Sequence, residues 1–326
     1  FNPDFGQVEA DPSVLNLSAF ETRLNEKRPF FVQGANFFSS WMRVFNSRRI
    51  GQRPGFIKPD SGDIVDQPNE TTILSAAKVL GETSTGVKYG IINAITNQEY
   101  ASLEFEKDGK TVKKDFLIEP YSNYFVGRIT KPFINDLSEI GFMATDLKRN
   151  GYSDIATSLK GDFLINLLDN KFSLTGEYGS TINDRKTGFG GRYRISYRHP
   201  VLWEFATWGG FYDNKWDVGA MGFQQKNNNW YTGARLSLRT DQPRGAFLNQ
   251  ELNFRQWVSG RHNGLITRNN FEIESENRFT NYWRFGFQIQ LNPETYVDDD
   301  IYRDSRAVLI KDEAWQEYNV WVSTDS

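Results

Sequence analysis

Three glutamates at alternate positions of one segment carry the clearest catalytic spacing in the sequence. Glu272, Glu274 and Glu276 lie at i, i+2 steps in "FEIESENRF", so in a strand they share one face with about 7 Å between neighbours. Glycosidases hold their two catalytic carboxylates about 5 to 9.5 Å apart. Consecutive same-face residues of any strand have this spacing, however, and nothing here marks a substrate cleft. We therefore expect a charged wall and no enzyme, with a surface glycan hydrolase using Glu274 as the weaker alternative.

Arginines recur on the polar face of several segments. In "FGGRYRISYR", aromatic side chains alternate with basic ones, so one strand would carry an aromatic face and a cationic face. Guanidinium groups suit carboxylates and phosphates, which predicts attraction of anionic solutes or sugar acids. The alternative is that these arginines pair with acidic neighbours and hold the wall together. The residues concerned are Arg192, Arg194, Arg198, Arg235, Arg239 and Arg255.

Composition excludes several other kinds of site. The chain has no cysteine and two histidines, so disulfides and Cys-based zinc sites are absent and no cofactor is implied. Asp298 and Asp300 lie in the acidic stretch "YVDDDIYRD" and are weak candidates for binding Ca²⁺, which oxygen-rich loops can hold, but the Gly and distal Glu of an EF-hand are missing. We expect a solvated loop there and no metal. A net charge of -3 gives no attraction to nucleic acid.

The elements that must position these residues are strands. From Thr71 onward, runs of about ten residues alternate in polarity and are separated by turn signals such as "LLDNKF" and "KDGK", the latter through Asp108-Gly109. One run opposes Phe125 and Ile129 to Val126 and Arg128. We expect about 14 to 16 strands, mostly antiparallel.

The character of the two faces favours a membrane protein over a soluble sandwich. The runs are longer than the usual soluble strand and suit a tilted crossing of the bilayer. Mid-strand charges on one face are tolerated in the wet lumen of a closed barrel. Aromatic residues beside turns are typical of interfacial girdles: Tyr212, Trp216, Trp230, Tyr231, Tyr282 and Trp283. These features predict an all-β, antiparallel outer-membrane β-barrel of 14 or more strands, whose aromatic face touches lipid.

The first 150 residues also carry a resemblance. "FNPDFGQVEADPSVLNLSAFET", "EKRPFFVQG", "SRRIG", "ILSAAKVLGETSTG" and "NYFVGR" occur in order. Together they resemble a bacterial family of unknown function, common in Bacteroidetes-type organisms. Its members look like outer-membrane barrels and often follow a family-9-like carbohydrate-binding module. The resemblance implies the same location here, but no catalytic residues, and the module itself is missing. The closing "VWVSTDS" lacks the terminal aromatic residue of such barrels, which predicts further strands beyond residue 326.

Residues 1–70 differ from the rest, because they mix Pro, Gly and acidic residues with apolar clusters. We expect a strand near Phe5–Glu9, a helical turn near Ser18–Asn25, and packing of this segment inside or beneath the barrel formed by residues 71–326. A plug or gate role and a purely structural role are both open for its charged residues, which are Asp4, Glu9, Asp11, Arg48 and Arg49.

Two functions follow from this interpretation. The first is passage or capture of a polar solute, such as an oligosaccharide, in an aromatic and charged lumen at the outer membrane. The second is a plugged barrel that anchors a carbohydrate-binding module or other surface proteins. The expected partners are outer-membrane lipid, a polar or glycan solute, and other surface proteins.

Overall fold

The computed structural model describes residues 21–55, 63–107, 110–151, 155–224, 226–240, 242–297 and 309–324. Nearly all regular structure in these residues is β, and none of the described helices is long and apolar enough to cross a membrane. The helical elements are α1 (Pro29–Val32), α2 (Ala35–Phe38) and the 3-10 turn η1 (Ser47–Arg49).

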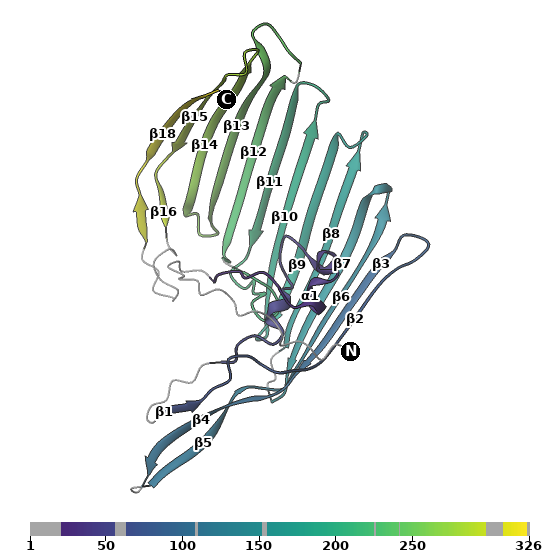
Figure 1. Cartoon of the computed structure of the whole chain (residues 1–326), viewed down its shortest axis with the longest axis vertical. Coiled ribbons are helices and arrows are strands. Elements are labelled where there is room, and N and C mark those ends of the chain that lie inside the picture. Colours follow the sequence, from purple (N-terminus) through teal and green to yellow (C-terminus); the bar gives the residue numbers. More distant parts are fainter. Residues whose placement is uncertain are drawn as a thin grey trace.

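Thirteen strands form one large, curved antiparallel sheet (Figure 1). Its strands are β2 (Ile73–Glu82), β3 (Lys88–Thr96), β6 (Ser122–Phe133), β7 (Asn135–Arg149), β8 (Ile155–Leu167), β9 (Phe172–Asn183), β10 (Lys186–Arg198), β11 (Trp203–Tyr212), β12 (Asn229–Thr240), β13 (Phe247–Arg261), β14 (Ile266–Phe279), β15 (Arg284–Asn292) and β18 (Trp315–Ser323). Their spatial order is β18-β15-β14-β13-β12-β11-β10-β9-β8-β7-β6-β3-β2. The expected all-β, antiparallel architecture is confirmed.

The described sheet is open. Its edges are β2 and β18, which do not pair with each other in the part of the chain that the structure describes. It has thirteen strands, against the fourteen or more expected for the barrel. The strand number of the sheet is lower than expected partly because a separate hairpin shows the same alternation of polar and apolar residues. The sequence pattern does not show which sheet an alternating segment will join.

That hairpin consists of β4 (Glu99–Lys107) and β5 (Lys110–Glu119), and it leaves the large sheet altogether. It forms a three-stranded sheet with β1 (Asp63–Asp66), in the order β1-β4-β5, and projects from one end of the molecule (Figure 1). The expectation that every run after Thr71 belongs to the wall is therefore wrong for β4 and β5. Their turn at Asp108-Gly109 lies outside the described residues. β16 (Thr295–Val297) and β17 (Ile310–Asp312) form a further small pair.

Short turns connect successive strands of the wall. Asp184 and Arg185 both have positive φ, of 49° and 59°, which is the two-residue geometry that matches the twist of a hairpin. They join β9 to β10. The turn predicted in "LLDNKF" joins β8 to β9 at Leu168 to Asn170, and is confirmed.

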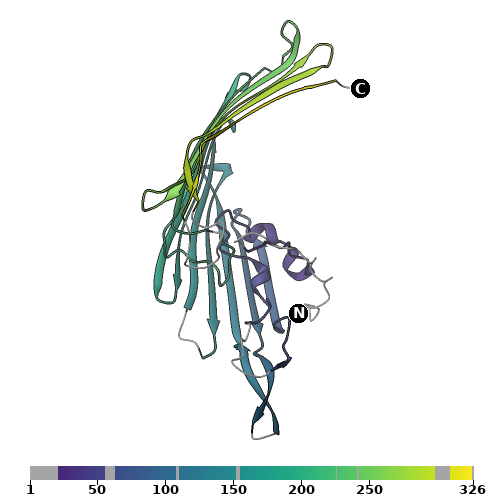
Figure 2. The ribbon, with the colours of Figure 1, turned by 90° about the vertical axis from the view of Figure 1, so that its left-hand side faces the viewer.

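Strand register separates the sheet into two unlike faces. Val126 lies beside Ile92 and Thr145, whereas its neighbour Phe125 points to the opposite face. Figure 2 shows the sheet curving around the helices, so the face that carries Val126 is concave. The convex face is lined by exposed apolar side chains in nearly every strand: Val79, Ile91, Ile129, Phe142, Phe163, Tyr178, Phe189, Tyr193, Phe205, Phe211, Leu238, Phe254, Phe271, Leu291, Tyr318 and Val320.

The described part of the N-terminal segment, residues 21–55, packs on the concave face. Pro29 occupies the first turn of α1, where its missing N–H costs nothing, and Gly34 takes a φ of 71° between the two helices. Residues 21–28 form no helix, so the helical turn expected near Ser18–Asn25 is wrong for its described part. The expected strand near Phe5–Glu9 lies outside the described residues.

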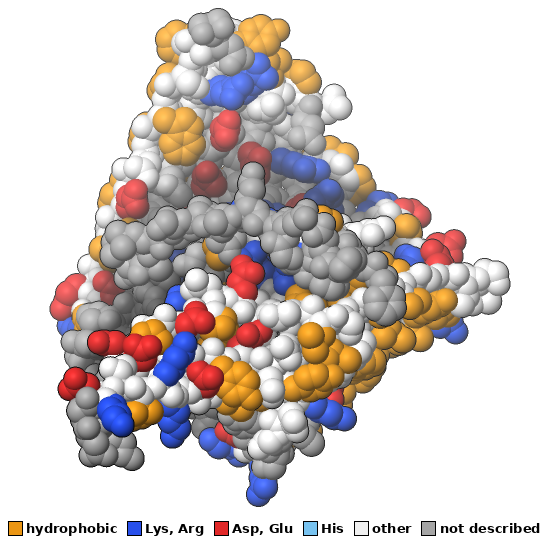
Figure 3. Space-filling view, turned by 60° about the horizontal axis from the view of Figure 1, so that its bottom comes forward, with side chains coloured by type: hydrophobic (Ala, Val, Ile, Leu, Met, Phe, Trp, Pro, Cys, Tyr) orange, Lys and Arg blue, Asp and Glu red, His pale blue; other side chains and the backbone are white. Residues whose placement is uncertain are grey.

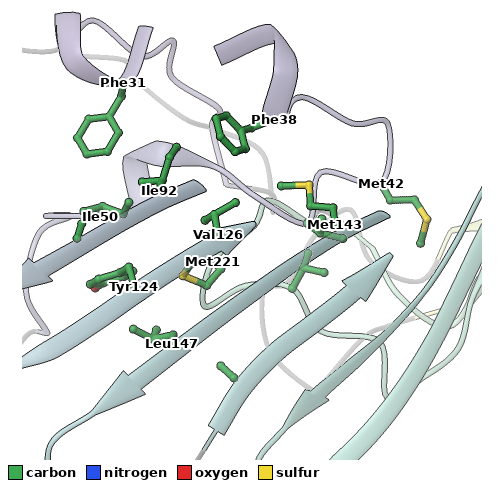
Figure 4. Close-up of a cluster of buried hydrophobic side chains, with 14 of the residues drawn as sticks. Phe31, Phe38, Met42, Ile50, Ile92, Tyr124, Val126, Met143, Leu147 and Met221 are labelled. Atoms are coloured by element: carbon green, nitrogen blue, oxygen red, sulfur yellow. The ribbon is translucent and has the colours of Figure 1, made fainter. Parts of the chain in front are cut away.

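One hydrophobic core joins this segment to the sheet (Figure 4). Phe31, Phe38, Met42, Val44 and Ile50 contribute from the segment, and strands β2, β3, β6, β7 and β8 contribute the opposite side of the core. A third part comes from the connection between β11 and β12, which contributes Trp216, Val218 and Met221. Because the core lies against one face of the sheet, the convex apolar face is left uncovered by the residues that the structure describes.

Polar groups fix the start of the segment. Glu26 accepts hydrogen bonds from the Arg28 guanidinium at 2.8 and 2.9 Å and from the Ser47 hydroxyl at 2.7 Å. Burial alone would raise the pKa of Glu26, but these hydrogen bonds and the charge of Arg28 outweigh it and lower the pKa to about 2. The ionised carboxylate therefore stabilises the folded segment.

We expect acid to loosen residues 21–55 through Glu26. A folded pKa of about 2, against an ordinary 4.5, means that the stabilisation is complete above about pH 4.5 and is lost as pH falls towards 2. Pepsin digestion of wild type and Glu26→Gln at each pH measures this contribution. Wild type should be the more resistant at pH 4.5, and the two should converge near pH 2. A constant difference across this range would contradict the assignment.

Gly188→Ala is expected to destabilise the fold. A Cβ at Gly188 would overlap the backbone of Lys215 and Trp216, which crosses the strand there. Overpacking of this kind costs about 1–3 kcal/mol, and the thermal midpoint followed by circular dichroism should fall. Gly161→Ala is the matched control, because the nearest atom to its Cβ would be a carbonyl oxygen 3.9 Å away. Equal midpoints for the two variants would contradict this packing.

Candidate functional site

A network of buried charges fastens the N-terminal segment to the concave face. The side chain of Lys160 in β8 is fully buried, and its Nζ contacts Asp162 Oδ1 at 2.7 Å and Glu177 Oε1 at 3.2 Å. Arg128 in β6 approaches Asp162 Oδ2 at 2.9 Å and donates to the Ser39 carbonyl at 3.1 Å. The network therefore spans strands β6, β8 and β9.

Glu177 connects this network to the segment backbone. Its two carboxylate oxygens accept hydrogen bonds from the N–H groups of Trp41, at 3.1 Å, and Met42, at 2.7 Å. Lys78 in β2 adds a second fastening, because its ammonium group donates to the carbonyls of Phe30 and Gln33. A buried charge that loses its partner costs about 3–5 kcal/mol, so the segment is held by more than apolar contact.

The arginines and glutamates predicted from the sequence all lie on the concave face, with Arg192 against Trp41 at the edge of this segment and the others further along the sheet. Register places Arg235 beside Arg255, and Arg255 beside Glu272. Three close ion pairs link them to acidic side chains: Arg198 to Glu204 at 2.9 Å, Arg235 to Glu204 at 2.8 Å, and Arg255 to Glu272 at 2.9 Å. For these arginines, the alternative of pairing within the wall describes the structure.

Arg192 and Arg194 are different. The Arg192 guanidinium lies 4.3 Å from the centre of the Trp41 ring, and that of Arg194 lies 5.8 Å from the centre of the Trp208 ring. Neither has a carboxylate within 4 Å among the described residues. The two arginines thus contact aromatic rings where the other three contact acids.

The glutamate row does not form a hydrolytic pair. Glu272 is engaged with Arg255, Glu274 lies beside Asn253 and Gln288, and Glu276 lies beside Glu251 and Gly286. Figure 3 shows acidic and basic side chains together inside the hollow of the curved sheet. The arrangement is a mixed polar surface that can hydrogen-bond a solute.

The plug residues named from the sequence are placed in part. Arg48 donates to the Asn25 carbonyl at 3.1 Å, and Arg49 donates to the Gly222 carbonyl at 2.9 Å and pairs with Glu21 at 2.7 Å. Arg49 thus attaches the segment to the connection between β11 and β12, and Arg48 joins two parts of the segment. Asp4, Glu9 and Asp11, like Asp298 and Asp300, lie outside the described residues. Within the described ranges, no group of three or more His, Cys, Asp or Glu side chains is placed to hold a metal ion.

Sequence reasoning missed Lys160, Asp162, Glu177 and Arg128 as a unit. Each of these residues occupies an alternate position on the polar side of its strand, so the face on which it lies was predictable. Their contact with one another beside Trp41 was not, because it brings together residues 136 positions apart in the sequence.

The position expected for Trp216 in an interfacial girdle is wrong, because this residue is 1% exposed and lies in the core. Tyr282 and Trp283, at 56% and 49% exposed, remain free for such a role.

The convex face also contains a hollow. A shallow hollow of about 410 Å³ lies among apolar side chains of β12 to β15, including Leu236, Phe254, Phe271 and Ile289. Most of its lining residues are apolar, and Arg255, Gln256 and Glu272 complete the lining. The charged side chains of the candidate site lie mainly on the other, concave face.

Comparison with known proteins gives a family and no function. No curated protein and no solved structure matches the chain. One family model does match, over residues 1–326, and it is described as a domain of unknown function (DUF5916). The chain therefore belongs to this family.

Proposed function

We propose that this chain forms the wall of an outer-membrane β-barrel whose convex face lies against lipid. The observation that carries the proposal is the uncovered apolar surface that continues across the thirteen-stranded sheet. The largest exposed apolar patch of a typical soluble monomer is only about 300–600 Å². Lipid would cover this surface without requiring any polar partner.

Strand dimensions support this proposal. Strands β6 to β14 have 10 to 15 residues, which at about 3.3 Å per residue gives roughly 33 to 50 Å. Tilted by about 45°, such strands span a hydrocarbon core of about 30 Å. Lipid cannot satisfy the backbone of a sheet edge. We therefore infer that β2 and β18 pair in the membrane, either with each other or with additional strands.

Residues 21–55 would then act as a plug, which favours capture of a polar solute over free diffusion. They cover the concave face of β2 to β9, fastened by Lys160 and Glu177. The concave face of β10 to β15 keeps its arginines, glutamates and amides for a solute such as an oligosaccharide. The proposed localisation is the outer membrane of a bacterium, in keeping with the family resemblance of the sequence.

A second candidate, an anchor or assembly partner, is favoured by the projecting sheet β1-β4-β5. It extends beyond the end of the wall (Figure 1) and exposes apolar side chains, including Val65, Tyr100 and Leu117. A surface of this kind suits docking of another protein. In relatives that the sequence resembles, a carbohydrate-binding module precedes the barrel, and such a module is one candidate partner.

Insertion into lipid is tested with two lysines on opposite faces of β13. Phe254→Lys places a charge on the convex face, where a mid-bilayer lysine costs about 2–4 kcal/mol. Asn253→Lys places it on the concave face beside Glu251 and Glu274. Flotation with liposomes should show strong loss of insertion for Phe254→Lys and wild-type insertion for Asn253→Lys. Equal insertion of both, or a wild-type chain that stays monodisperse without detergent, would exclude the membrane assignment.

The plug is tested with Glu177→Ala, which removes the acceptor for Trp41, Met42 and Lys160. Protease should then cut residues 21–55 faster, and planar bilayers should show ion conductance that wild type lacks. Glu272→Ala is the matched control, because it also removes a paired concave carboxylate but lies away from the segment. A variant that loses the segment and stays electrically silent would favour the anchor function.

A further inference from the structure

A group of arginines without acidic partners lies where the N-terminal segment meets β10. Arg192 has Glu177 as its neighbour across the strands, but both oxygens of Glu177 are occupied by Trp41, Met42 and Lys160. The Nε of Arg192 is buried and has no hydrogen-bond partner. Arg192 therefore keeps an unused Nε–H donor beside a carboxylate whose two oxygens both have other partners.

Arg43 brings a second guanidinium to the same place. Met42 and Val44 are buried in the core, while Trp41 and Arg43 point outward. The Arg43 guanidinium lies 5.7 Å from the centre of the Phe223 ring, and no ion pair of Arg43 occurs among the described residues. Burial, followed by the charges of Arg23 and Arg192, lowers the pKa of Arg43. Arg43 follows by two residues the Trp41 on which the Arg192 guanidinium stacks, so an anion beside Trp41 would be attracted by both positive charges.

Trp41 and Tyr231 complete the surroundings. Trp41 is 47% exposed although Arg192 stacks on it, which leaves apolar ring surface open to solvent. Register places Arg192, Gly210 and Tyr231 in one row across three strands. Because Gly210 has no side chain, the Tyr231 hydroxyl lies directly over it, where a Cβ would be only 2.7 Å away. The hydroxyl is thus directed towards Arg192.

Among the described residues, the absence of acidic partners at Arg43 and Arg192 is a local feature, because neighbouring arginines on the same face do have such partners. Arg198, Arg235 and Arg255 on the same face each have a carboxylate within 2.9 Å. At Arg192 and Arg43, aromatic rings take the place of acids. A cation flanked by aromatic rings and a hydroxyl can receive both a negatively charged group and the carbon face of a sugar ring.

We propose that Arg43 and Arg192, with Trp41 and Tyr231, bind an acidic saccharide. Its carboxylate lies between the two guanidinium groups, and its ring packs on the exposed indole of Trp41. Arg23 adds positive charge at the outer side. The inference rests on the proposed capture function and names the class of solute, a uronate-bearing glycan. The site lies at the border of the plug, so a bound ligand would contact both the segment and the wall.

Calorimetric titration of the detergent-solubilised chain with D-glucuronate tests the site, with D-glucose as the neutral analogue and inorganic sulfate as the bare oxyanion. Glucuronate should bind at least tenfold more tightly than either. Arg43→Gln and Arg192→Gln should each weaken glucuronate binding by about tenfold or more, as expected for the loss of a charge-assisted hydrogen bond. Trp41→Leu should weaken glucuronate binding and leave sulfate binding unchanged.

Arg185→Gln is the control, since it removes an exposed arginine in the turn between β9 and β10, and glucuronate binding should be unchanged. Arg43 is exposed and lies outside the core, so Arg43→Gln remains informative even if Arg192→Gln disturbs the fold. Protease resistance of residues 21–55 verifies each variant.

Four results would overturn the inference: no glucuronate binding by the wild-type chain, glucuronate binding by Arg43→Gln as tight as by wild type, glucose binding as tight as glucuronate binding, or sulfate binding as tight as glucuronate binding. Because lipid insertion is measured separately, a chain that inserts and fails to bind glucuronate rejects only this site. A chain that binds glucuronate and fails to insert rejects the membrane wall instead.

Discussion

The alternation of side chains along adjacent strands is the constraint on which the rest of this molecule depends. When each strand pairs in register with the next, every second residue of the sheet joins the same surface. A shift of one residue in any pair would exchange apolar and charged side chains between the faces. The register therefore determines together the outer apolar surface, the packing of residues 21–55 and the row that joins Arg192 to Tyr231.

Two kinds of contact hold the mostly irregular segment of residues 21–55 against the concave face of the sheet. Apolar contacts around Phe38 and Val126 provide non-directional attachment, and burial of this kind does not select one orientation. Hydrogen bonds, which are directional, select one orientation of the segment. Glu177 accepts from two successive backbone N–H groups, and Arg128 donates to the Ser39 carbonyl. Because Glu177 is used in this way, Arg192 next to it has no acid of its own. One carboxylate thus both positions the segment and shapes the neighbouring charge.

Sequence reasoning reached the fold class, the two faces and several turns because these depend on local periodicity. Phe125 and Val126 were assigned to opposite faces correctly, and the turn after Leu168 was recognised from "LLDNKF". It failed where distant segments meet. Trp216 looked like an interfacial residue because it follows a turn, yet the chain folds it under residues of the N-terminal segment. The partners of Lys160 and Glu177 could not be found from spacing, since no periodicity links residues 41 and 177.

The chain segment that forms β4 and β5 interrupts the sequence, but not the pairing, of strands β3 and β6 in the large sheet. The chain leaves the sheet after Thr96 and re-enters at Ser122, where these two residues are paired. All the residues between them are looped out while β3 and β6 pair as though joined directly. Ends so close together make this junction tolerant of changes in the length of what lies between them. It is a natural point at which evolution, or a protein engineer, can exchange an appendage without altering the scaffold.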